Sequence, residues 1–291
     1  MNLWQNYVSP SSISEAILAL TSPPGPALPL AGGTDLLLDL EQGRHPPVHT
    51  LVDLTTVPEM KLLELRGDYL FIGAAIPLNH IARHALTAAH AQALVEACDL
   101  VGGPQVRNVA TLGGNVAHAL PAADGTIALV ALDAEAEIAS ASGLRRVPFG
   151  ELFVGPGKSA LKHGEELLVG FYIRVHTSAN TASCFQRIMR PQGVALPIIN
   201  LAVWLERDGK CLADVHIAVG PGAATPFRAR SAEGVLRGKI LDDASAAASL
   251  EALLAEVKFR SSPRRAGSDY RRHLVASLFK DTLAAAWQRG E

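Results

Sequence analysis

Two glycine pairs mark the places in this chain where the backbone can approach a ligand most closely. The first pair stands in the run Leu30-Ala31-Gly32-Gly33-Thr34-Asp35-Leu36. We predict a short strand over residues 27–30, a tight turn at the glycines and the start of a helix over residues 35–40. Glycine tolerates positive φ and has no Cβ to keep a ligand away. Because unpaired N–H groups at a helix start attract anions, this turn predicts a phosphate contact.

The second pair lies about eighty residues further on, in Thr111-Leu112-Gly113-Gly114-Asn115. A single glycine turn is most simply explained as a structural turn with Thr34 or Asp35 as the helix cap. Two such turns predict a clamp on both sides of one diphosphate. Asp124 follows the second pair, and its carboxylate can accept hydrogen bonds from sugar or ribityl hydroxyls, as acidic residues do in other dinucleotide sites. The structural alternative for Asp124 is a helix N-cap.

Length and composition indicate a globular protein with more than one unit. The chain has 291 residues, of which 48% are hydrophobic and 19% charged, so two or three units can each bury a core. The net charge of −2 and the lack of a long basic run argue against a nucleic-acid partner. The N-terminus lacks a signal-peptide pattern, and no apolar run approaches the ~18 residues of a membrane span. We therefore expect a cytoplasmic protein without a transmembrane segment.

The cysteines and histidines form no metal-binding motif. Cys98, Cys184 and Cys211 are isolated, so we expect no iron–sulfur cluster on this chain. His80 and His84 have the i, i+4 spacing of zinc ligands, but no glutamate follows the first histidine and no third ligand is near. We expect no metal ion at this pair.

Changes in pattern along the chain predict three units, over residues 1–55, 56–176 and 177–291, with the polar segment 174–183 as the main boundary. Strands are expected over 50–54, 62–65, 69–74, 135–140, 145–147, 167–173, 196–206 and 212–219, in addition to 27–30. Helices are expected over 13–20, 77–85, 88–101, 126–132, 244–257 and 268–289. A group of arginines near the C-terminus is either a solvated helix rim or a partner surface: Arg260, Arg264, Arg265, Arg271 and Arg272.

Together these motifs resemble the FAD-binding (medium) subunits of molybdenum hydroxylases, a family that includes aerobic carbon monoxide dehydrogenase, bacterial xanthine dehydrogenase and quinoline oxidoreductase. The resemblance rests on the first glycine motif, on the run Gln105-Val106-Arg107-Asn108-Val109-Ala110 that leads into the second motif, and on Ala123-Asp124. It extends over nearly the whole chain. Further similar segments are Glu165-Glu166-Leu167-Leu168, residues 260–265 and Tyr270-Arg271.

The resemblance implies an α+β protein. Its first part would be a two-lobed FAD-binding fold of the PCMH type, followed by a C-terminal α+β domain with an antiparallel sheet and helices. FAD would be bound noncovalently, with Asp124 near the ribityl chain and Leu168 and Val101 or Gly102 near the flavin ring. Gln186 stands where some relatives carry a lysine near the flavin. The residues implied around the diphosphate are Leu30, Ala31, Gly32, Gly33, Thr34, Asp35, Leu36, Thr111, Gly113, Gly114 and Asn115.

The resemblance also implies a reaction. In such enzymes a large subunit hydroxylates the substrate at a molybdenum–molybdopterin centre, and a small subunit passes the electrons through two [2Fe–2S] clusters. This chain would take them onto FAD and deliver them to NAD⁺, a quinone or oxygen, in a dimer of heterotrimers (a heterohexamer). We assign no general base or nucleophile. The alternatives are a self-sufficient FAD-dependent oxidoreductase of the same fold and a scaffold that has lost the flavin.

Overall fold

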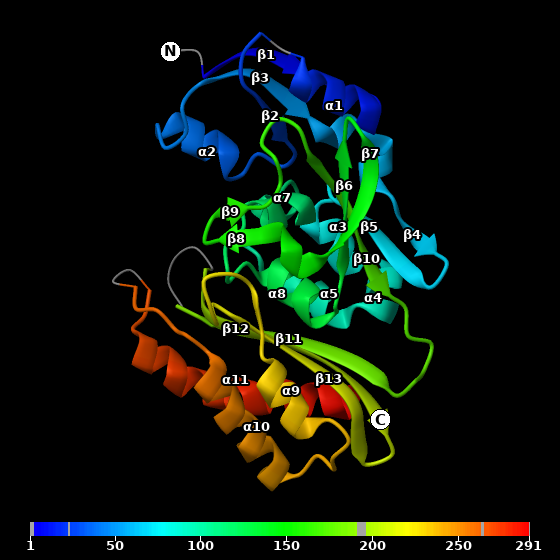
Figure 1. The fold of residues 1–291 in the computed structure, drawn as a ribbon, viewed down its shortest axis with the longest axis vertical. Coiled ribbons are helices and arrows are strands. Elements are labelled where there is room, and N and C mark those ends of the chain that lie inside the picture. The colour runs from blue at the N-terminus through cyan, green and yellow to red at the C-terminus, as the bar shows by residue number, and fades with distance from the viewer. Residues whose placement is uncertain (1–2, 23, 191–195, 263–264, 291) are drawn as a thin grey trace.

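The computed structural model describes residues 3–22, 24–190, 196–262 and 265–290. Its three main sheets follow one another along the long axis of the molecule (Figure 1). Helices and strands are mixed throughout, which confirms the predicted α+β class. The division into units 1–55, 56–176 and 177–291 stays a prediction, and each of the three sheets is formed within one of these ranges.

The first sheet is small and parallel, with strand order β1-β3-β2. The side chain of Ser12 accepts a hydrogen bond from the N–H of Glu15 at 3.2 Å and so caps the first helix, as its sequence predicts. Strand β1 was not predicted, because all its residues are exposed and show no apolar alternation. The elements are β1 (Trp4–Val8), α1 (Ile13–Thr21), β2 (Ala27–Leu30), α2 (Leu36–Glu41) and β3 (Val48–Asp53).

The second sheet is antiparallel, with strand order β4-β5-β10-β6-β7. Its central strand β10 is buried over all but its last residue, which explains the continuous apolar run in its sequence. Between β7 and β10 the chain forms a separate two-stranded ribbon, in which β8 pairs with β9. The bounds are β4 (Leu63–Arg66), β5 (Tyr69–Gly73), β6 (Glu135–Ser140), β7 (Gly143–Pro148), β8 (Phe153–Gly155), β9 (Lys158–Ser159) and β10 (Leu167–Arg174).

Six short helices connect β5 to β6. The segment predicted as two helices, over 77–85 and 88–101, forms three, because the chain turns at His84 and again at Ala91. His84 Nδ1 accepts a hydrogen bond from the N–H of Leu86 at 3.3 Å and thereby caps the second of them. The helices are α3 (Leu78–Arg83), α4 (Ala85–His90), α5 (Gln92–Leu100), α6 (Pro104–Arg107), α7 (Leu112–Ala117) and α8 (Asp124–Ala131).

The third sheet is antiparallel, with order β11-β12-β13-β14, and its helices follow it in the sequence. A hairpin with its turn at Gly209 and Lys210 joins β12 and β13, the strands predicted over 196–206 and 212–219. Strand β11 and helix α9 were not predicted. The elements are β11 (Thr181–Met189), β12 (Pro197–Asp208), β13 (Cys211–Gly220), β14 (Phe227–Arg228), α9 (Arg230–Leu236), α10 (Asp243–Glu256) and α11 (Ser268–Arg289).

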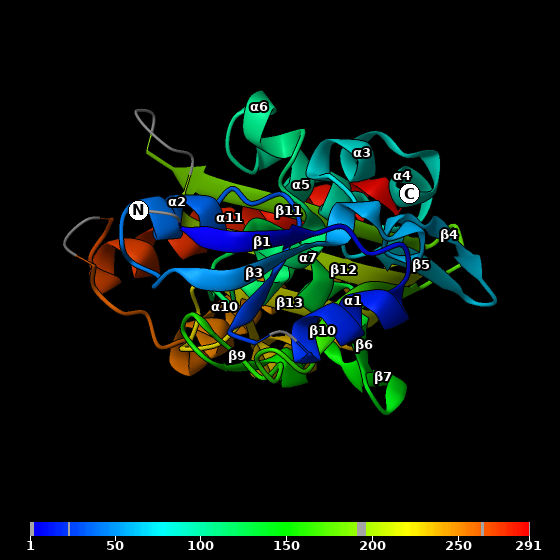
Figure 2. The ribbon, with the colours of Figure 1, turned by 90° about the horizontal axis from the view of Figure 1, so that it is seen from above.

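Helices cover the third sheet on both faces (Figures 1 and 2). Helices α9 and α11 pack on one face, and α5 and α8 of the second unit pack on the other. Glu96 on α5 fixes this junction: its Oε2 accepts the N–H of Phe185 at 2.7 Å, and its Oε1 lies 2.5 Å from the guanidinium of Arg289. One face of the third sheet therefore packs against α5 and α8 and covers that side of the second unit.

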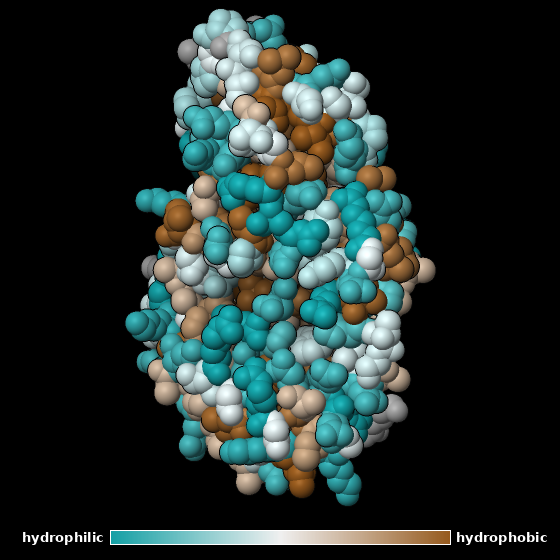
Figure 3. Space-filling model, turned by 45° about the vertical axis from the view of Figure 1, so that its right-hand side comes forward, coloured by the Kyte–Doolittle hydropathy of each residue, from teal (hydrophilic) through white to brown (hydrophobic). Residues whose placement is uncertain are grey.

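Polar side chains dominate the middle of the face in Figure 3, whereas apolar side chains gather on the upper part, at the level of the small parallel sheet. Exposed apolar residues of that unit include Trp4, Tyr7, Val8 and Leu18. Among the described residues, no helix is both long and apolar enough to cross a bilayer.

The close packing of α7 generates a first prediction. A Cβ at Gly113 would lie 2.6 Å from the carbonyl oxygen of Ala74, and the N–H of Gly113 donates to that same oxygen at 2.9 Å. Gly113→Ala should therefore lower the free energy of unfolding of the apoprotein by roughly 1–3 kcal/mol, the usual cost of overpacking. Urea denaturation measures the change.

The matched control is Gly234→Ala, because Gly234 is also helical and nothing lies within 4 Å of its Cβ position. Alanine should raise stability there by about 0.5–1 kcal/mol. Equal effects at the two positions would show that α7 does not pack as described.

Candidate cofactor site

The first glycine turn presents backbone N–H groups that have no partner. Gly33 adopts φ 68°, which only glycine takes up readily. Within the described part of the chain, none of the N–H groups of residues 32–35 donates a hydrogen bond. Asp35 occupies the N-cap position of α2, but its side chain makes no capping bond. The turn is therefore not explained by a side-chain cap, and its N–H groups remain available to an anion.

This turn lies directly against the segment that leads into the second glycine motif. A Cβ at Gly32 would lie 2.1 Å from the carbonyl oxygen of Val109 and 2.7 Å from Cα of Ala110. No side chain fits in that space, so glycine is required where the two backbones meet. The two motifs that the sequence predicted to share a ligand are thus neighbours in the fold.

The second glycine motif forms the first turn of helix α7, with Thr111 as its N-cap. The hydroxyl of Thr111 accepts the N–H of Gly114 at 3.1 Å, and Gly113 donates to Ala74 as described above. The N–H of Leu112 donates to the carbonyl of Ile76 at 3.3 Å. These N–H groups already have partners, so the diphosphate contact of this motif, which stays a prediction, would have to use other atoms.

What this motif does offer is an open glycine surface and an amide side chain. Gly114 is exposed, and a Cβ there would contact only the Thr111 hydroxyl, at 3.3 Å. Asn115 Oδ1 is buried, and no described residue donates a hydrogen bond to it. It lies 2.9 Å from the position of a Cβ on Gly125, at the start of α8. A buried acceptor without a donor is costly, so a ligand hydroxyl or amide fits this position.

Asp124 is buried between the second and third units. It is the first residue of α8, whose N-cap is Ala123, and its side chain makes no capping bond, so the N-cap alternative is wrong. Its Oδ1 accepts a hydrogen bond from Asn200 Nδ2 at 2.7 Å, and its Oδ2 accepts one from Arg187. The side chains of Asp124 and Arg187 are 4% and 3% exposed.

Burial raises the pKa of Asp124 to about 6, because the loss of water disfavours the charged carboxylate more than Arg187 and Asn200 favour it. The carboxyl group therefore titrates close to neutral pH. It can hold a negative charge or a proton at the position where the second glycine motif meets the third sheet.

Gln186 is held by the third unit, and its contact with the flavin stays a prediction. Its Oε1 accepts a hydrogen bond from the hydroxyl of Thr282 on α11 at 3.4 Å, on the face of β11 that α11 covers. Side chains alternate along a strand, so Arg187 lies on the opposite face and reaches Asp124. Sequence reasoning missed Arg187 and Asn200. The signal for Arg187 was the alternation of the unrecognised strand β11, and Asn200 lies on the recognised strand β12.

Leu168 lies close to the second glycine motif, although its side chain is in the core. It is 6% exposed, and the carbonyl of the next residue, Val169, accepts the N–H of Ala74 at 2.8 Å. Ala74 is the residue against which Gly113 packs. This chain of contacts keeps Leu168 beside the candidate site, and its contact with the flavin stays a prediction.

Val101 and Gly102 form a turn held by Arg107. The guanidinium of Arg107 donates to the carbonyls of Val101 and Gly102 at 3.3 and 2.9 Å, and Gly102 adopts φ 54°. Both residues are half-buried at the end of α5, in the segment that leads into the second motif. Their contact with the flavin likewise stays a prediction.

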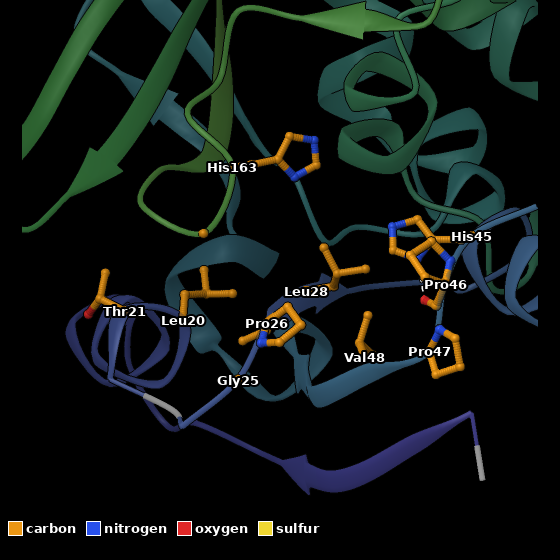
Figure 4. A pocket seen from close by; sticks show the side chains of 12 residues that line it. Leu20, Thr21, Gly25, Pro26, Leu28, His45, Pro46, Pro47, Val48 and His163 are labelled. Carbon is orange, nitrogen blue, oxygen red and sulfur yellow. Dashed lines mark hydrogen bonds between the residues drawn. The ribbon is translucent and has the colours of Figure 1, made fainter. Parts of the chain in front are cut away.

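A cavity of about 370 Å³ lies between the first sheet and the loop before β10 (Figure 4). Leu28 and Val48 line its apolar floor, and His45 and His163 face it from separate loops. None of the residues predicted to contact FAD lines this cavity. It is therefore distinct from the series of contacts that runs from the first glycine turn to Asp124.

Comparison with known proteins agrees with this geometry. The sequence profile of a family described as the FAD binding domain in molybdopterin dehydrogenase matches residues 3–173. A second profile, the CO dehydrogenase flavoprotein C-terminal domain, matches residues 183–286. The two matches cover nearly the whole chain and meet in the segment that the sequence predicted as a boundary.

Three relatives illustrate the breadth of the family. The xanthine dehydrogenase FAD-binding subunit of Escherichia coli O157:H7 is 31% identical, over 97% of this chain and 95% of that protein. The nicotine 6-hydroxylase medium subunit of Paenarthrobacter nicotinovorans is 31% identical, over 97% of each chain. A solved structure of carbon monoxide dehydrogenase from Hydrogenophaga pseudoflava superimposes with a TM-score of 0.91 at 28% identity, over 98% of each chain.

The sequence motifs, the fold and the relatives all indicate the same family, over both segments that the profiles match. FAD is the cofactor that the matching family binds, and the unpaired N–H groups, the open glycine and the buried amide oxygen suit such a ligand. The chain belongs to the family of FAD-binding (medium) subunits of molybdenum hydroxylases and is an FAD-dependent oxidoreductase subunit.

Proposed function

We propose that this chain takes electrons from [2Fe–2S] clusters on a small subunit and passes them through FAD to an external acceptor. A large subunit with a molybdenum–molybdopterin centre would oxidise the substrate. The complex would be a cytoplasmic dimer of heterotrimers. The observation that supports the proposal most is the continuous series of contacts from the first glycine turn through Asn115 to Asp124.

Each part of this series suits a different part of FAD. The free N–H groups of residues 32–35 would bind the diphosphate, and the open surface of Gly114 would let it approach. Asn115 and Asp124 would accept hydrogen bonds from the ribityl hydroxyls. When bound, FAD supplies a ring that accepts and releases electron pairs, while the protein holds and orients it.

A self-sufficient oxidoreductase fits the structure less well. Such an enzyme would bring its substrate against the flavin in its own pocket, next to an acid or base. The cavity that contains His45 and His163 shares no residue with the predicted flavin contacts. This separation favours electron delivery from another protein.

The absorption spectrum of the purified chain tests the proposal first. We expect flavin bands from one noncovalent FAD per chain, which acid precipitation releases into the supernatant. The isolated chain should not turn over hydroxylase substrates, and its flavin should be reduced by substrate only when both partner subunits are added. A chain without flavin would indicate a scaffold, and turnover by the chain alone would indicate the self-sufficient enzyme.

The open position of Gly114 generates a prediction about FAD affinity. Gly114→Val should raise the dissociation constant of FAD at least about tenfold, or 1.4 kcal/mol, because the branched side chain would occupy the space of the diphosphate. The fold should persist, since a side chain at this position meets only the Thr111 hydroxyl. The flavin content of the variant and of the unmodified chain reports FAD binding, and their circular dichroism spectra report the fold.

The control is Gly234→Val, which places the same side chain at an exposed helical glycine of the third unit. It should leave FAD affinity unchanged. Full flavin occupancy in the Gly114→Val protein would remove Gly114 from the site.

The burial of Asp124 generates a prediction about pH. Its pKa of about 6 in the folded protein is above the ~3.9 of an unfolded chain, so the folded state binds the extra proton. This stabilising contribution is fully present below pH ~3.9 and is lost as the pH rises through 6. Apoprotein with the native Asp124 should therefore gain stability relative to Asp124→Asn between pH 7 and pH 5, by roughly 1 kcal/mol.

Urea denaturation of both apoproteins at each pH measures this difference. The opposite slope would mean that Arg187 controls the titration and lowers the pKa. FAD titration of the same variant tests the ribityl contact separately: loss of a hydrogen bond to a charged group should weaken binding by roughly 1.5–3 kcal/mol.

A further inference from the structure

Three residues lie in register across the third sheet at the place where helix α8 begins. Arg187 on β11 pairs with Asn200 on β12, and Asn200 pairs with Gly220 on β13. Directly paired residues of antiparallel strands share one face of the sheet, and α8 packs on this face (Figure 1). A Cβ at Gly220 would lie 2.3 Å from Asn200 Oδ1 and 3.0 Å from Cα of Ala122. Glycine is therefore required here, because the amide of Asn200 and the start of α8 both come close to the backbone.

Both carboxylate oxygens of Asp124 accept hydrogen bonds from this row. Asn200 Nδ2 donates to Oδ1 of Asp124 at 2.7 Å and to the carbonyl of Ala122 at 3.1 Å. Since a carbonyl oxygen can only accept, it fixes which end of the Asn200 amide faces α8. Arg187 donates to Oδ2, and a guanidinium has no acceptor atom. Neither of these partners can accept the proton of a neutral carboxyl group, so the row holds Asp124 as an acceptor on both sides.

Arg187 supplies the charge that opposes the effect of burial on Asp124. Burial raises the pKa of Asp124, whereas the positive charge of Arg187 and the hydrogen bonds from Asn200 and Arg187 lower it. The side chains of Asp124 and Arg187 are 4% and 3% exposed, so water screens this pair little. The other elements that pack against α8 here bring neutral groups: the amide of Asn115 from α7, and from α5 the thiol of Cys98, whose pKa is raised by burial.

We propose that Arg187 is a positioning residue for FAD, which acts by holding the carboxylate of Asp124 as an acceptor for the ribityl hydroxyls. The inference rests on the proposed function and adds a residue to that same cofactor site. A hydrogen bond to an ionised group is roughly twice as strong as one between neutral groups, so a neutral Asp124 would bind the ribityl chain more weakly. The guanidinium of Arg187 is itself buried and bonded to Asp124, so its effect on FAD passes through that carboxylate.

The proposal couples FAD binding to the protonation of Asp124. If FAD selects the ionised carboxylate, binding releases a proton to the solvent from each molecule in which Asp124 is neutral. Because the pKa of Asp124 is about 6, about half a proton per FAD should be released at pH 6 and almost none at pH 8. The dissociation constant of FAD should therefore be constant at high pH and rise as the pH falls through 6, approaching about tenfold per pH unit.

Titration of the apoprotein with FAD between pH 5 and pH 8 measures this profile, and calorimetry in two buffers of different ionisation enthalpy counts the released protons. Arg187→Met removes the positive charge, which favours the neutral form of Asp124. The pH at which the dissociation constant begins to rise should therefore move up by about one to three units. Near pH 6 this variant should bind FAD roughly fivefold or more weakly than the unmodified chain. Arg187→Lys keeps the charge, so its profile should lie closer to that of the unmodified chain.

The matched control is Arg228→Met. The guanidinium of Arg228 lies 2.7 Å from the buried carboxylate of Glu233, and its side chain is 11% exposed. This ion pair joins β14 to α9 and contains no predicted flavin contact. The substitution removes a cation from a comparably buried pair, so it should leave the pH profile of FAD binding unchanged. Circular dichroism reports the fold of each variant.

A double-mutant cycle separates an effect through Asp124 from a direct contact of Arg187 with FAD. The Asp124→Asn chain has no carboxylate to ionise at this position, so adding Arg187→Met should change the dissociation constant of FAD by less than about twofold. The rise below pH 6 should be absent from both proteins. Because Arg187→Met/Asp124→Asn leaves no buried charge at this pair, the comparison stays available even if Arg187→Met alone folds poorly.

Four outcomes would overturn the inference. They are an unchanged pH profile in Arg187→Met, a lysine variant whose profile coincides with that of methionine, an equal shift in Arg228→Met, or an effect of Arg187→Met that persists beside Asp124→Asn. The last outcome would place Arg187 in direct contact with FAD. An unmodified chain that binds no FAD at any pH would refute the proposed function, whereas the four outcomes are measured on chains that bind FAD and leave that function standing.

Discussion

The fold depends on how the buried carboxylate of Asp124 is neutralised. Taking an ion out of water costs several kcal/mol, and here Arg187 and Asn200 of the third sheet offset part of that cost. Helix α8, which Asp124 begins, is buried along nearly its whole length between the second and third units. The position of this helix, and of Asn115 beside it, is thus set by Arg187 and Asn200, which follow Asp124 by more than sixty positions.

Local patterns were sufficient to predict much of the scaffold. The strand before the first glycine turn and helix α11 have the predicted bounds. Strands predicted next to each other in the sequence form the hairpins β4–β5 and β12–β13. The second glycine motif shows the limit of such patterns. Its sequence suits a ligand loop, yet Gly113 serves close packing against Ala74, and only Gly114 is open to a ligand. Sequence alone does not distinguish a glycine that packs from one that binds.

The errors at the site have a common physical origin. Because side chains alternate along a strand, a shift of one residue moves each side chain to the other face. Without knowledge that residues 181–189 form β11, the sequence did not indicate that Arg187 faces Asp124. The partners of Asp124 were missed for a related reason: they come from β11 and β12, and no local pattern indicates a pairing across so many residues.

The contact between Glu96 and Arg289 has a consequence for synthesis of the chain. Arg289 is almost the last residue, so Glu96 is translated nearly two hundred residues before its partner. While the ribosome is still adding α11, α5 carries a carboxylate whose guanidinium does not yet exist. The third sheet therefore lacks this contact with α5 until α11 has been synthesised, and loss of Arg289 leaves Glu96 with the N–H of Phe185 as its partner.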